Sequence, residues 1–405
     1  MTVAAVRSPA VPASAAAGHR LAPFGLLRAL DHPGQVFASI TPNWFASVMG
    51  TGIVANAAAS LPVQFPGLRT FGVVIWALAG VLLLAVTAAT AMHWISARPA
   101  AMAHHRDPVM SHFYGAPPMA LLTVGAGTLL LGRDVIGLRA AVDIDWVLWL
   151  AGTATGLVVA VVLPALAFTR PGASAGGSAG SAPSGAFGGW LMPVVPPMVS
   201  AATGALLVPY TPAGQARLAL LLGCYAMFGL SLVASFILIT LLWQRLTAGH
   251  AVPARLVPTW WIVLGPLGQS ITAANLLGGT AALALPAPYA RALAVFGLVY
   301  GVPAWGFALL WAAVAARITA ATVRHGLPFS LTWWSFTFPV GTLVTGTAGL
   351  ALHTHAALFR VSATACYAVL VAAWVVVASR TLRGCLRGDL FLSGQVTGRR
   401  SVIPE

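Results

Sequence analysis

The chain has 405 residues, of which 59% are hydrophobic and 7% are charged. A soluble domain carries roughly 25% charged residues, so this composition excludes a soluble globular protein. The formal net charge is +14, but the basic residues avoid the long apolar segments, which excludes a continuous basic face for nucleic acid. We therefore interpret the chain as an all-α integral membrane protein.

The chain begins with a segment, residues 1–40, that we expect to be a cytoplasmic tail. Residues 1–20 are rich in alanine and proline, and the segment lacks the pattern of a cleaved signal peptide. Residues 21–37 have the length and apolar character of a short helix on the membrane surface. We predict no spanning element before residue 41.

Apolar segments long enough to cross about 30 Å of hydrocarbon follow one another from residue 41 to residue 380. We predict ten spans, near residues 42–61, 70–94, 113–131, 144–168, 190–208, 217–243, 258–285, 291–315, 331–352 and 357–379. Residues 171–189 are almost entirely Gly, Ser, Ala and Pro and predict a flexible linker inside this one domain. Residues 381–405 are predicted to form a basic cytoplasmic tail.

The arginines indicate the orientation of the spans. Ten spans place both termini on one side of the membrane, and that side collects fifteen of the 21 basic residues, all of which are arginine. The other side holds only Arg69, Arg133, Arg139, Arg217, Arg291 and Arg360. The positive-inside rule then makes both termini cytoplasmic. The alanine- and arginine-rich composition is typical of a GC-rich bacterial genome, which favours a bacterial plasma membrane.

A motif recurs five times at intervals of 69 to 77 residues, about the length of two membrane helices with their connections. An aromatic residue opens an apolar segment, and glycine or proline interrupts it about a turn and a half later. The openers are Trp44, Phe113, Trp190, Trp261 and Trp334, and the interruptions are Met49-Gly50, Pro117-Pro118, Pro196-Pro197, Gly265-Pro266 and Pro339. This repeat predicts five helical hairpins whose odd helices are kinked at mid-membrane.

Odd and even segments differ in polarity. The odd segments hold most polar residues at membrane depth, whereas the even ones are mostly smooth aliphatic runs suited to face lipid. We therefore predict an inner ring of five kinked odd helices around a central pathway and an outer ring of five even helices. A single break of this kind is explained by close helix packing alone, but five breaks at matched depth in alternate helices favour a pathway.

The predicted pathway lacks acidic residues. The seven acids are Asp31, Asp107, Asp134, Asp143, Asp145, Asp389 and Glu405, and none is predicted at the centre of a span. Proton relays and cation sites usually need a membrane-embedded carboxylate. Hydroxyls, amides and backbone N–H groups at the helix breaks suit an anion instead.

Cysteines and histidines do not predict a cofactor or metal site. Cys224, Cys366 and Cys385 have no metal-binding spacing, and His93 and His353 are predicted on opposite membrane faces, where they cannot share a haem. His104, His105 and His112 lie in the first cytoplasmic connection and are interpreted as interfacial residues. An alternative is that these three histidines sense cytoplasmic pH.

Four stretches in the odd segments resemble one family. They are Pro42-Asn43-Trp44-Phe45-Ala46-Ser47-Val48-Met49-Gly50-Thr51-Gly52-Ile53, Pro193-Val194-Val195-Pro196-Pro197-Met198-Val199, Leu264-Gly265-Pro266-Leu267-Gly268-Gln269 and Trp333-Trp334-Ser335-Phe336-Thr337-Phe338-Pro339-Val340-Gly341. They are similar to the tellurite-resistance/dicarboxylate transporter family, which includes bacterial tellurite-resistance proteins, fungal malate and sulfite transporters, and plant slow anion channels. The similarity spans about residues 40 to 380.

The resemblance implies ten helices in five hairpins with quasi-fivefold symmetry, an anion pore through the inner ring, and a homotrimer. It also implies a phenylalanine gate on the ninth helix, which corresponds to Phe338, with Phe336 as the second choice. An aromatic ring in a narrow apolar constriction removes the water that a passing anion needs. The alternative for Phe338 is simple packing against a neighbouring helix. The first helix departs from the pattern because it has Met49-Gly50 where later odd helices have proline.

Candidate site residues come from these motifs. The predicted lining and break positions are Phe45, Met49, Gly50, Thr51, Gly52, Pro117, Pro118, Pro196, Pro197, Gly265, Pro266, Gly268, Pro339 and Gly341. The polar pore candidates are Ser200, Thr203, Gln269, Ser270, Thr342 and Thr345. No catalytic or metal-binding residue is predicted.

These features lead to one main hypothesis and two alternatives. The first is a passive, gated pathway in a lipid bilayer for small anions such as chloride, nitrate, sulfite or a dicarboxylate. The second is a carrier or efflux protein for C4-dicarboxylates such as malate, or for sulfite, with or without proton coupling. A membrane oxidoreductase is disfavoured because the chain has no paired histidines at one depth, no redox cysteine set and no nucleotide-binding loop.

Overall fold

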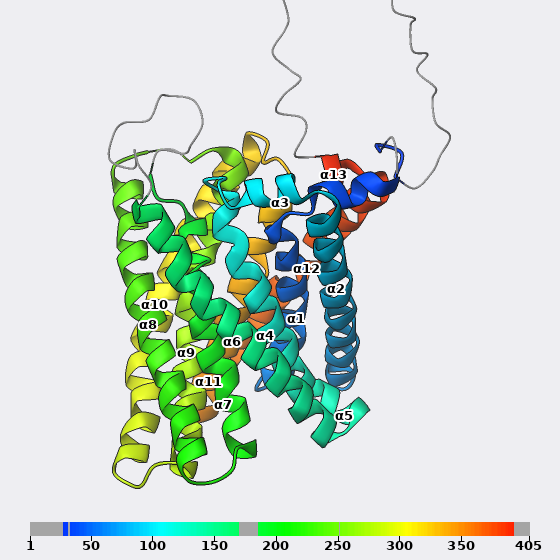
Figure 1. The fold of residues 1–405 in the computed structure, drawn as a ribbon. Helices are drawn as coiled ribbons and strands as arrows, with labels where there is room; N and C mark the ends of the chain where they lie inside the picture. Colours follow the sequence, from blue (N-terminus) through cyan, green and yellow to red (C-terminus); the bar gives the residue numbers. More distant parts are fainter. Residues whose placement is uncertain (1–26, 31–32, 170–184, 251, 393–405) are drawn as a thin grey trace, which may run out of the picture.

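The computed structural model describes residues 27–30, 33–169, 185–250 and 252–392. The described residues form helices and turns, with no strand among them. The helices run side by side in one bundle, and the short helices α3 (Arg98–His104) and α13 (Asp389–Leu392) lie at the same end of it (Figure 1). All ten segments expected to be apolar spans are helical over most of their length.

Five segments are largely buried, and each is a short 3-10 helix followed by an α-helix, with a turn between the two in the third segment. The pairs are η2 (Pro42–Trp44) with α1 (Phe45–Ser60), η3 (Met110–Gly115) with α4 (Ala116–Gly127), η5 (Gly188–Leu191) with α7 (Pro196–Leu207), η7 (Ala254–Val263) with α9 (Leu264–Thr280), and η9 (Leu331–Phe336) with α11 (Phe338–Thr354). We call these the inner segments.

Short helices extend three of the inner segments. A π-helix, η4 (Thr128–Gly132), and α5 (Arg133–Ile136) continue α4, η6 (Val208–Tyr210) continues α7, and η8 (Ala281–Leu283) continues α9. One further 3-10 helix, η1 (Pro33–Ser39), precedes η2.

Five long helices cover the inner segments. They are α2 (Leu68–Ser96), α6 (Leu138–Thr169), α8 (Gln215–Thr247), α10 (Tyr289–Arg324) and α12 (Ala357–Arg387). Each exposes large apolar side chains, for example Leu84 at 73% and Ile95 at 78% on α2. Such surfaces are stable only against lipid or another subunit.

The inner helices contact one another in cyclic order: α1 contacts α4, α4 contacts α7, α7 contacts α9, α9 contacts α11, and α11 contacts α1. Each long helix packs against two successive inner helices: α2 on α1 and α4, α6 on α4 and α7, α8 on α7 and α9, α10 on α9 and α11, and α12 on α11 and α1. The same packing relationship thus recurs five times within the described part of the chain.

Indole groups on the long helices hydrogen-bond to the inner segments. Trp76 of α2 donates to Thr128 Oγ1 at 3.0 Å, Trp149 of α6 to the Ser200 carbonyl at 2.9 Å, and Trp374 of α12 to Thr51 Oγ1 at 3.1 Å. On α10, Trp305 donates to Thr347 and Trp311 to the carbonyl of Trp260. In an apolar environment such bonds satisfy polar groups that water cannot reach, so they fix how the helices are rotated.

The predicted mid-helix kinks are wrong in detail, because the breaks are junctions between a 3-10 helix and an α-helix. Pro196 is the first residue of α7, and Pro117, Pro118, Pro266 and Pro339 lie in the first turn of their α-helices. At these positions proline has no intrahelical hydrogen bond to lose, and its fixed φ favours helix initiation. Proline therefore starts the α-helices instead of bending them.

The first inner helix has no break at Met49-Gly50. α1 runs without interruption from Phe45 to Ser60, and its 3-10 junction lies earlier, at Trp44 and Phe45. Because glycine lowers helix stability without removing a hydrogen bond, Gly50 can remain inside a continuous helix. All five aromatic openers nevertheless lie in the 3-10 helices that precede the inner α-helices.

The described ends of the chain meet on one face of the bundle. The Leu27 amide donates to the carbonyl of Leu386 at 2.7 Å, and the Ala29 amide to that of Arg387 at 2.9 Å. The Trp44 and Phe391 rings stack with centroids 5.4 Å apart. Residues 33–39 form a 3-10 helix instead of part of a longer surface helix, and the Gly/Ser linker up to residue 184 lies outside the described residues.

Seven helical stretches of the described chain are long and apolar enough to cross a membrane. They include the five long helices, residues 110–136 and residues 331–354. The α-helical parts of the other inner segments are shorter, with 16 residues in α1, 12 in α7 and 17 in α9. The all-helical architecture and these apolar spans identify an integral membrane protein.

Candidate functional site

A small cavity lies where the five inner segments meet. Its volume is about 20 Å³, enough for about one water molecule. Every inner segment contributes to its wall, which is formed by Ala46, Met49, Phe113, Met119, Met192, Val195, Ile262, Gly265, Leu331, Ser335, Phe338 and Pro339. Ser335 is the only one of these residues with a polar side chain. Within the described residues, the cavity is therefore a narrow apolar constriction at the point where the five inner segments meet.

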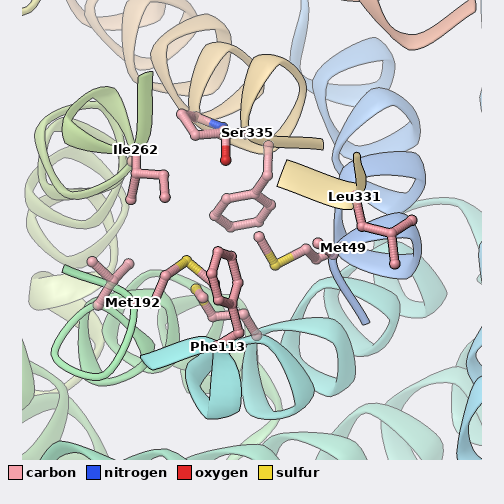
Figure 2. A pocket seen from close by; sticks show the side chains of 12 residues that line it. Met49, Phe113, Met192, Ile262, Leu331 and Ser335 are labelled. Carbon is pink, nitrogen blue, oxygen red and sulfur yellow. The ribbon is translucent and has the colours of Figure 1, made fainter. Parts of the chain in front are cut away.

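Two aromatic rings and the three thioethers of Met49, Met119 and Met192 form part of the wall of the constriction. Phe113 and Phe338 are each 2% exposed, and Met49 and Met192 are each 3% exposed. Figure 2 shows Phe113, Met49 and Met192 pointing toward one another from different helices. A hydrated anion cannot fit in the remaining volume, so the structure is closed at this level.

Phe336, the second choice for a gate, lies elsewhere. Its ring packs edge-to-face against Trp261 and Trp333, with centroids 5.7 Å away in both cases. It is absent from the cavity wall, whereas Phe338, the first residue of α11, is part of it. The local reason is the junction at Thr337, where the chain changes from 3-10 to α-helix and turns Phe338 inward.

Only some of the predicted lining residues reach the cavity. Met49, Gly265, Phe338 and Pro339 line it, and a Cβ on Gly265 would meet nothing within 4 Å. The other predicted positions are helix contacts or first-turn prolines outside the cavity wall: Phe45, Gly50, Thr51, Gly52, Pro117, Pro118, Pro196, Pro197, Pro266, Gly268 and Gly341.

Several of these glycines permit helices to approach closely. A Cβ on Gly268 of α9 would collide with the backbone of Thr342 and Leu343 of α11, and one on Gly341 would collide with Ile53 of α1. A Cβ on Gly52 would lie 2.9 Å from Cγ2 of Thr123 on α4. Small residues at such contacts are the usual way in which membrane helices pack.

Most predicted polar pore residues bond to neighbouring helices or to their own. Ser270 Oγ accepts from the Tyr300 hydroxyl of α10 at 2.7 Å, and Thr342 Oγ1 donates to the Leu264 carbonyl at 3.0 Å or to that of Pro339 at 2.7 Å. Thr203 donates to the Val199 carbonyl at 2.9 Å. The Ser200 hydroxyl is buried without a hydrogen-bond partner, while its carbonyl accepts from Trp149 of α6.

Gln269, Thr272 and Thr345 form a polar layer beyond the constriction. Gln269 is 5% exposed, and its Oε1 is buried without a donor. Thr272 Oγ1 and Thr345 Oγ1 lie 2.8 Å apart and link α9 to α11. The predicted residues Gln269 and Thr345 thus lie, with Thr272, on the neighbouring inner helices α9 and α11.

Asp145 is more buried than its sequence position suggested. It lies on α6, eight residues into the helix, with no exposed surface and no hydrogen bond to either carboxylate oxygen. A Cβ on Gly125 of α4 would lie 2.5 Å from its Oδ1. The carboxylate therefore packs against the outer side of an inner helix, away from the cavity.

A wider depression lies at the other end of α1. It encloses about 620 Å³ and is lined by residues around the α1–α2 connection, with Leu352 of α11. Arg69 lies on its rim, where its Nε donates to Asp134 Oδ2 at 2.6 Å. The salt bridge offsets the charge of Arg69, so this rim attracts anions less than a lone arginine would.

Histidines gather at the end of the bundle that carries α3. The His93 and His104 rings lie 5.4 Å apart, His93 Nδ1 donates to the Phe37 carbonyl, and the Tyr114 hydroxyl lies 3.2 Å from His105 Nδ1. Burial lowers the pKa of His104, and His93 and His105 lower it further, while Asp107 raises it. No cluster of three metal-ligating side chains occurs among the described residues.

Sequence reasoning missed several cavity residues, chiefly Phe113, Met119, Met192, Ile262 and Ser335. The sequence did distinguish Phe113, because it is a phenylalanine whereas the other four aromatic openers are tryptophans. The tryptophan openers Trp261 and Trp334 donate to Thr319 of α10 and Thr381 of α12, respectively, so they face outward. Met192 and Ile262 gave no comparable signal, because their inward direction depends on the turn of the 3-10 segments.

Comparisons with known proteins agree with this architecture. Residues 39–382 match the SLAC1 family, described as voltage-dependent anion channel. The sulfite efflux pump SSU1 of Arthroderma otae is 29% identical over 359 residues, covering 86% of this chain and 92% of the fungal protein. The uncharacterized transporter MJ0576 of Methanocaldococcus jannaschii is 26% identical over 321 residues, covering 79% of this chain and 86% of the archaeal protein.

Proposed function

The chain belongs to the SLAC1 family of anion channels and transporters, and on that premise we propose that it conducts small anions passively through a gated central pathway. This is the family that the four sequence motifs predicted. The pathway follows the axis of the inner segments, from the apolar constriction through the polar layer. Chloride, nitrate, sulfite and dicarboxylates are the candidate substrates.

One observation carries the proposal: all five inner segments converge on a single cavity with no charged residue in its wall. A proton or cation pathway would need a carboxylate at this depth. An apolar constriction of this size instead blocks ions by excluding water, and it opens when a side chain moves.

Phe338 is the residue that we propose as the gate. It lies in the cavity wall at the first turn of α11, directly after the 3-10 junction. At a junction the ring meets less packing from its own helix than it would mid-helix, so a rotamer change is less costly. Rotation of this ring, together with movement of Phe113, would widen the constriction.

The finer architecture is part of the proposal. The cyclic contacts of the inner helices support ten spans in five hairpins with quasi-fivefold symmetry, in which the short helices α1, α7 and α9 cross the membrane with their 3-10 extensions. The arginine distribution supports cytoplasmic termini. The exposed apolar surface of the long helices is compatible with a homotrimer. A bacterial plasma membrane is supported by composition alone, since the relatives named above are fungal and archaeal.

A carrier is the second candidate function. It would export sulfite or move C4-dicarboxylates such as malate, and relatives named as sulfite efflux pumps favour it. The unpartnered Asp145 is an observation that favours proton coupling in such a carrier, because a buried carboxylate can bind and release a proton.

Flux into liposomes tests the proposal. The purified protein is reconstituted, and uptake of chloride, nitrate, sulfite, malate and succinate is measured in competition, with and without a pH gradient. A channel gives flux that follows each anion's own gradient and is indifferent to the proton gradient. Uphill anion accumulation driven by the proton gradient would contradict a channel and establish the carrier.

A further inference from the structure

The polar layer lies on the face of α9 that points to the bundle axis. Gly265 lines the cavity, and Gln269 and Thr272 follow it by four and seven residues, which places them on the same helix face. The other faces of α9 are occupied: Gly268 packs on the α11 backbone, and Ser270 bonds to Tyr300 of α10. Gln269 therefore projects into the pathway about one turn beyond the constriction.

The carbonyl oxygen of the Gln269 side chain, Oε1, is buried without a protein partner. It makes no side-chain hydrogen bond within the described part of the chain, although the side chain is only 5% exposed. A glutamine amide offers two N–H donors and one carbonyl acceptor, and this holds whichever way the amide is turned. Buried polar groups are usually paired, and an unpaired one destabilises the fold. This side chain is therefore suited to a ligand that both accepts and donates hydrogen bonds.

The threonine pair beside it has no hydrogen left for a ligand. Thr345 Oγ1 is 3.0 Å from the carbonyl of Thr342, Thr272 Oγ1 is 3.0 Å from that of Gly268, and the two hydroxyls are 2.8 Å apart. Each hydroxyl has one hydrogen, and these contacts use both. The pair consequently presents lone pairs, which would repel a bare anion and accept from an O–H group.

We propose that this layer selects oxyanions that retain one proton, such as hydrogen sulfite or a singly ionised dicarboxylate. The Gln269 N–H groups would bind the anionic oxygens, and the amide carbonyl and threonine oxygens would accept from the O–H group. Chloride and nitrate have no hydrogen to donate, so they leave these acceptors unpaired. Uncharged polar groups are enough to select protonated oxyanions over chloride and nitrate, because the substrate itself carries the proton.

The inference rests on the proposed anion transport, and the two can be tested separately. The full-length protein is reconstituted in liposomes, and initial influx of sulfite and of chloride is measured at a pH below and a pH above the second ionisation of sulfurous acid. Leakage into protein-free liposomes is subtracted at each pH. If neither anion enters through the wild-type protein, the proposed function itself fails.

The wild-type protein should carry sulfite in proportion to the concentration of the hydrogen sulfite ion, while chloride influx should be nearly independent of pH. Gln269→Leu should lower sulfite influx about tenfold, since a hydrogen-bonded charge loses its partner. Chloride influx should fall less than sulfite influx, because chloride loses only the N–H donors, whereas hydrogen sulfite also loses the carbonyl that accepts from its O–H group. The sulfite-to-chloride ratio is therefore the decisive quantity.

Ser270→Ala is the matched control, because it removes a hydroxyl on the neighbouring residue that faces α10 instead of the pathway. It should leave the ratio unchanged. If Gln269→Leu does not elute as a folded protein, Gln269→Asn replaces it, and this shorter amide should give an intermediate ratio. Equal loss of both anions in either variant, or a wild-type sulfite influx that follows the doubly charged ion, would overturn the inference.

Discussion

Phe113 of η3 and Phe338 of α11 line the same central cavity, although they belong to different inner segments. Both rings are 2% exposed and stand in a wall made mostly of aliphatic and thioether side chains. Two aromatic rings therefore narrow the constriction, together with the methionines of its wall. This arrangement makes the contribution of each ring measurable.

We expect Phe338→Ala to raise anion flux by at least about tenfold, because loss of the ring opens a water-filled passage through the constriction. The measurement is chloride efflux from liposomes with equal amounts of reconstituted protein. Phe336→Ala is the control, since that ring packs on Trp261 and Trp333 outside the cavity. Unchanged flux in a folded Phe338→Ala protein would remove Phe338 as the gate.

Phe113→Ala should also raise flux, to a smaller extent, because Phe338 still occupies part of the cavity. The double variant should conduct less than the product of the two single effects predicts, since either opening alone admits water. Efflux measured for the wild type, both single variants and the double variant gives a complete double-mutant cycle. Fully independent effects would mean that the two rings do not close the same passage.

Gly268→Ala should destabilise the protein by about 1–3 kcal/mol, because the added methyl group meets the α11 backbone, which cannot move aside easily. Gly265→Ala adds the same methyl group on the same helix, where nothing lies within 4 Å. That variant should keep wild-type stability and conduct less, because its methyl group narrows the cavity. Thermal melting in detergent and efflux separate the two outcomes, and equal melting temperatures would contradict the packing argument.

Asp145→Asn should preserve or raise the melting temperature, since a buried carboxylate without partners is costly to keep charged. Under the channel proposal the variant conducts like the wild type, with or without a pH gradient. Asp143→Asn, on the exposed side of the same helix, serves as the control. Loss of gradient-driven uptake in Asp145→Asn alone would support the proton-coupled carrier instead.

His104 should make the stability of the α2–α3 region depend on pH. Burial lowers the pKa of His104 in the folded state from the usual 6.5. Between this lowered pKa and 6.5, the unfolded chain therefore binds more protons than the folded chain. Stability then rises with pH in this window and falls on acidification through it. His93 and His105 act in the same direction, and Asp107 opposes them.

Melting temperatures at a series of pH values test this prediction. His104→Gln should reduce the decline in melting temperature at acidic pH. His325 is an exposed histidine, so His325→Gln should give the same dependence of melting temperature on pH as the wild type. A wild-type decline that survives intact in His104→Gln would assign the effect to other groups.

Much of the fold was predictable because a bilayer imposes strong constraints on a sequence. All ten expected segments are helical, with ends that differ by up to nine residues, and each aromatic opener lies in the 3-10 helix of an inner segment. The matched family range, 39–382, nearly coincides with the range over which the motifs occur. The length and hydropathy of each segment predict a membrane helix without knowledge of any tertiary contact.

The consequence of the prolines was not predictable in the same way. Their spacing indicated interruptions, but the same residues serve equally well to start a helix, and only the preceding turn distinguishes the two. Gly50, Gly268 and Gly341 likewise marked special positions, yet a close helix contact and a pore wall require the same small residue. The neighbouring helix decides between them.

The sequence by itself determined that this protein crosses the membrane as helices and which helices are buried, while the motif of the proposed gate was indicated by the family resemblance. Only the tertiary structure decided that Phe113 and Met192 join Phe338 in one cavity, that Asp145 is buried, and that Oε1 of Gln269 has no partner. The physical reason is rotation about the helix axis. Hydropathy fixes the depth of a residue, but hydrogen bonds such as those from Trp149 and Trp374 to the inner segments fix the direction in which it points.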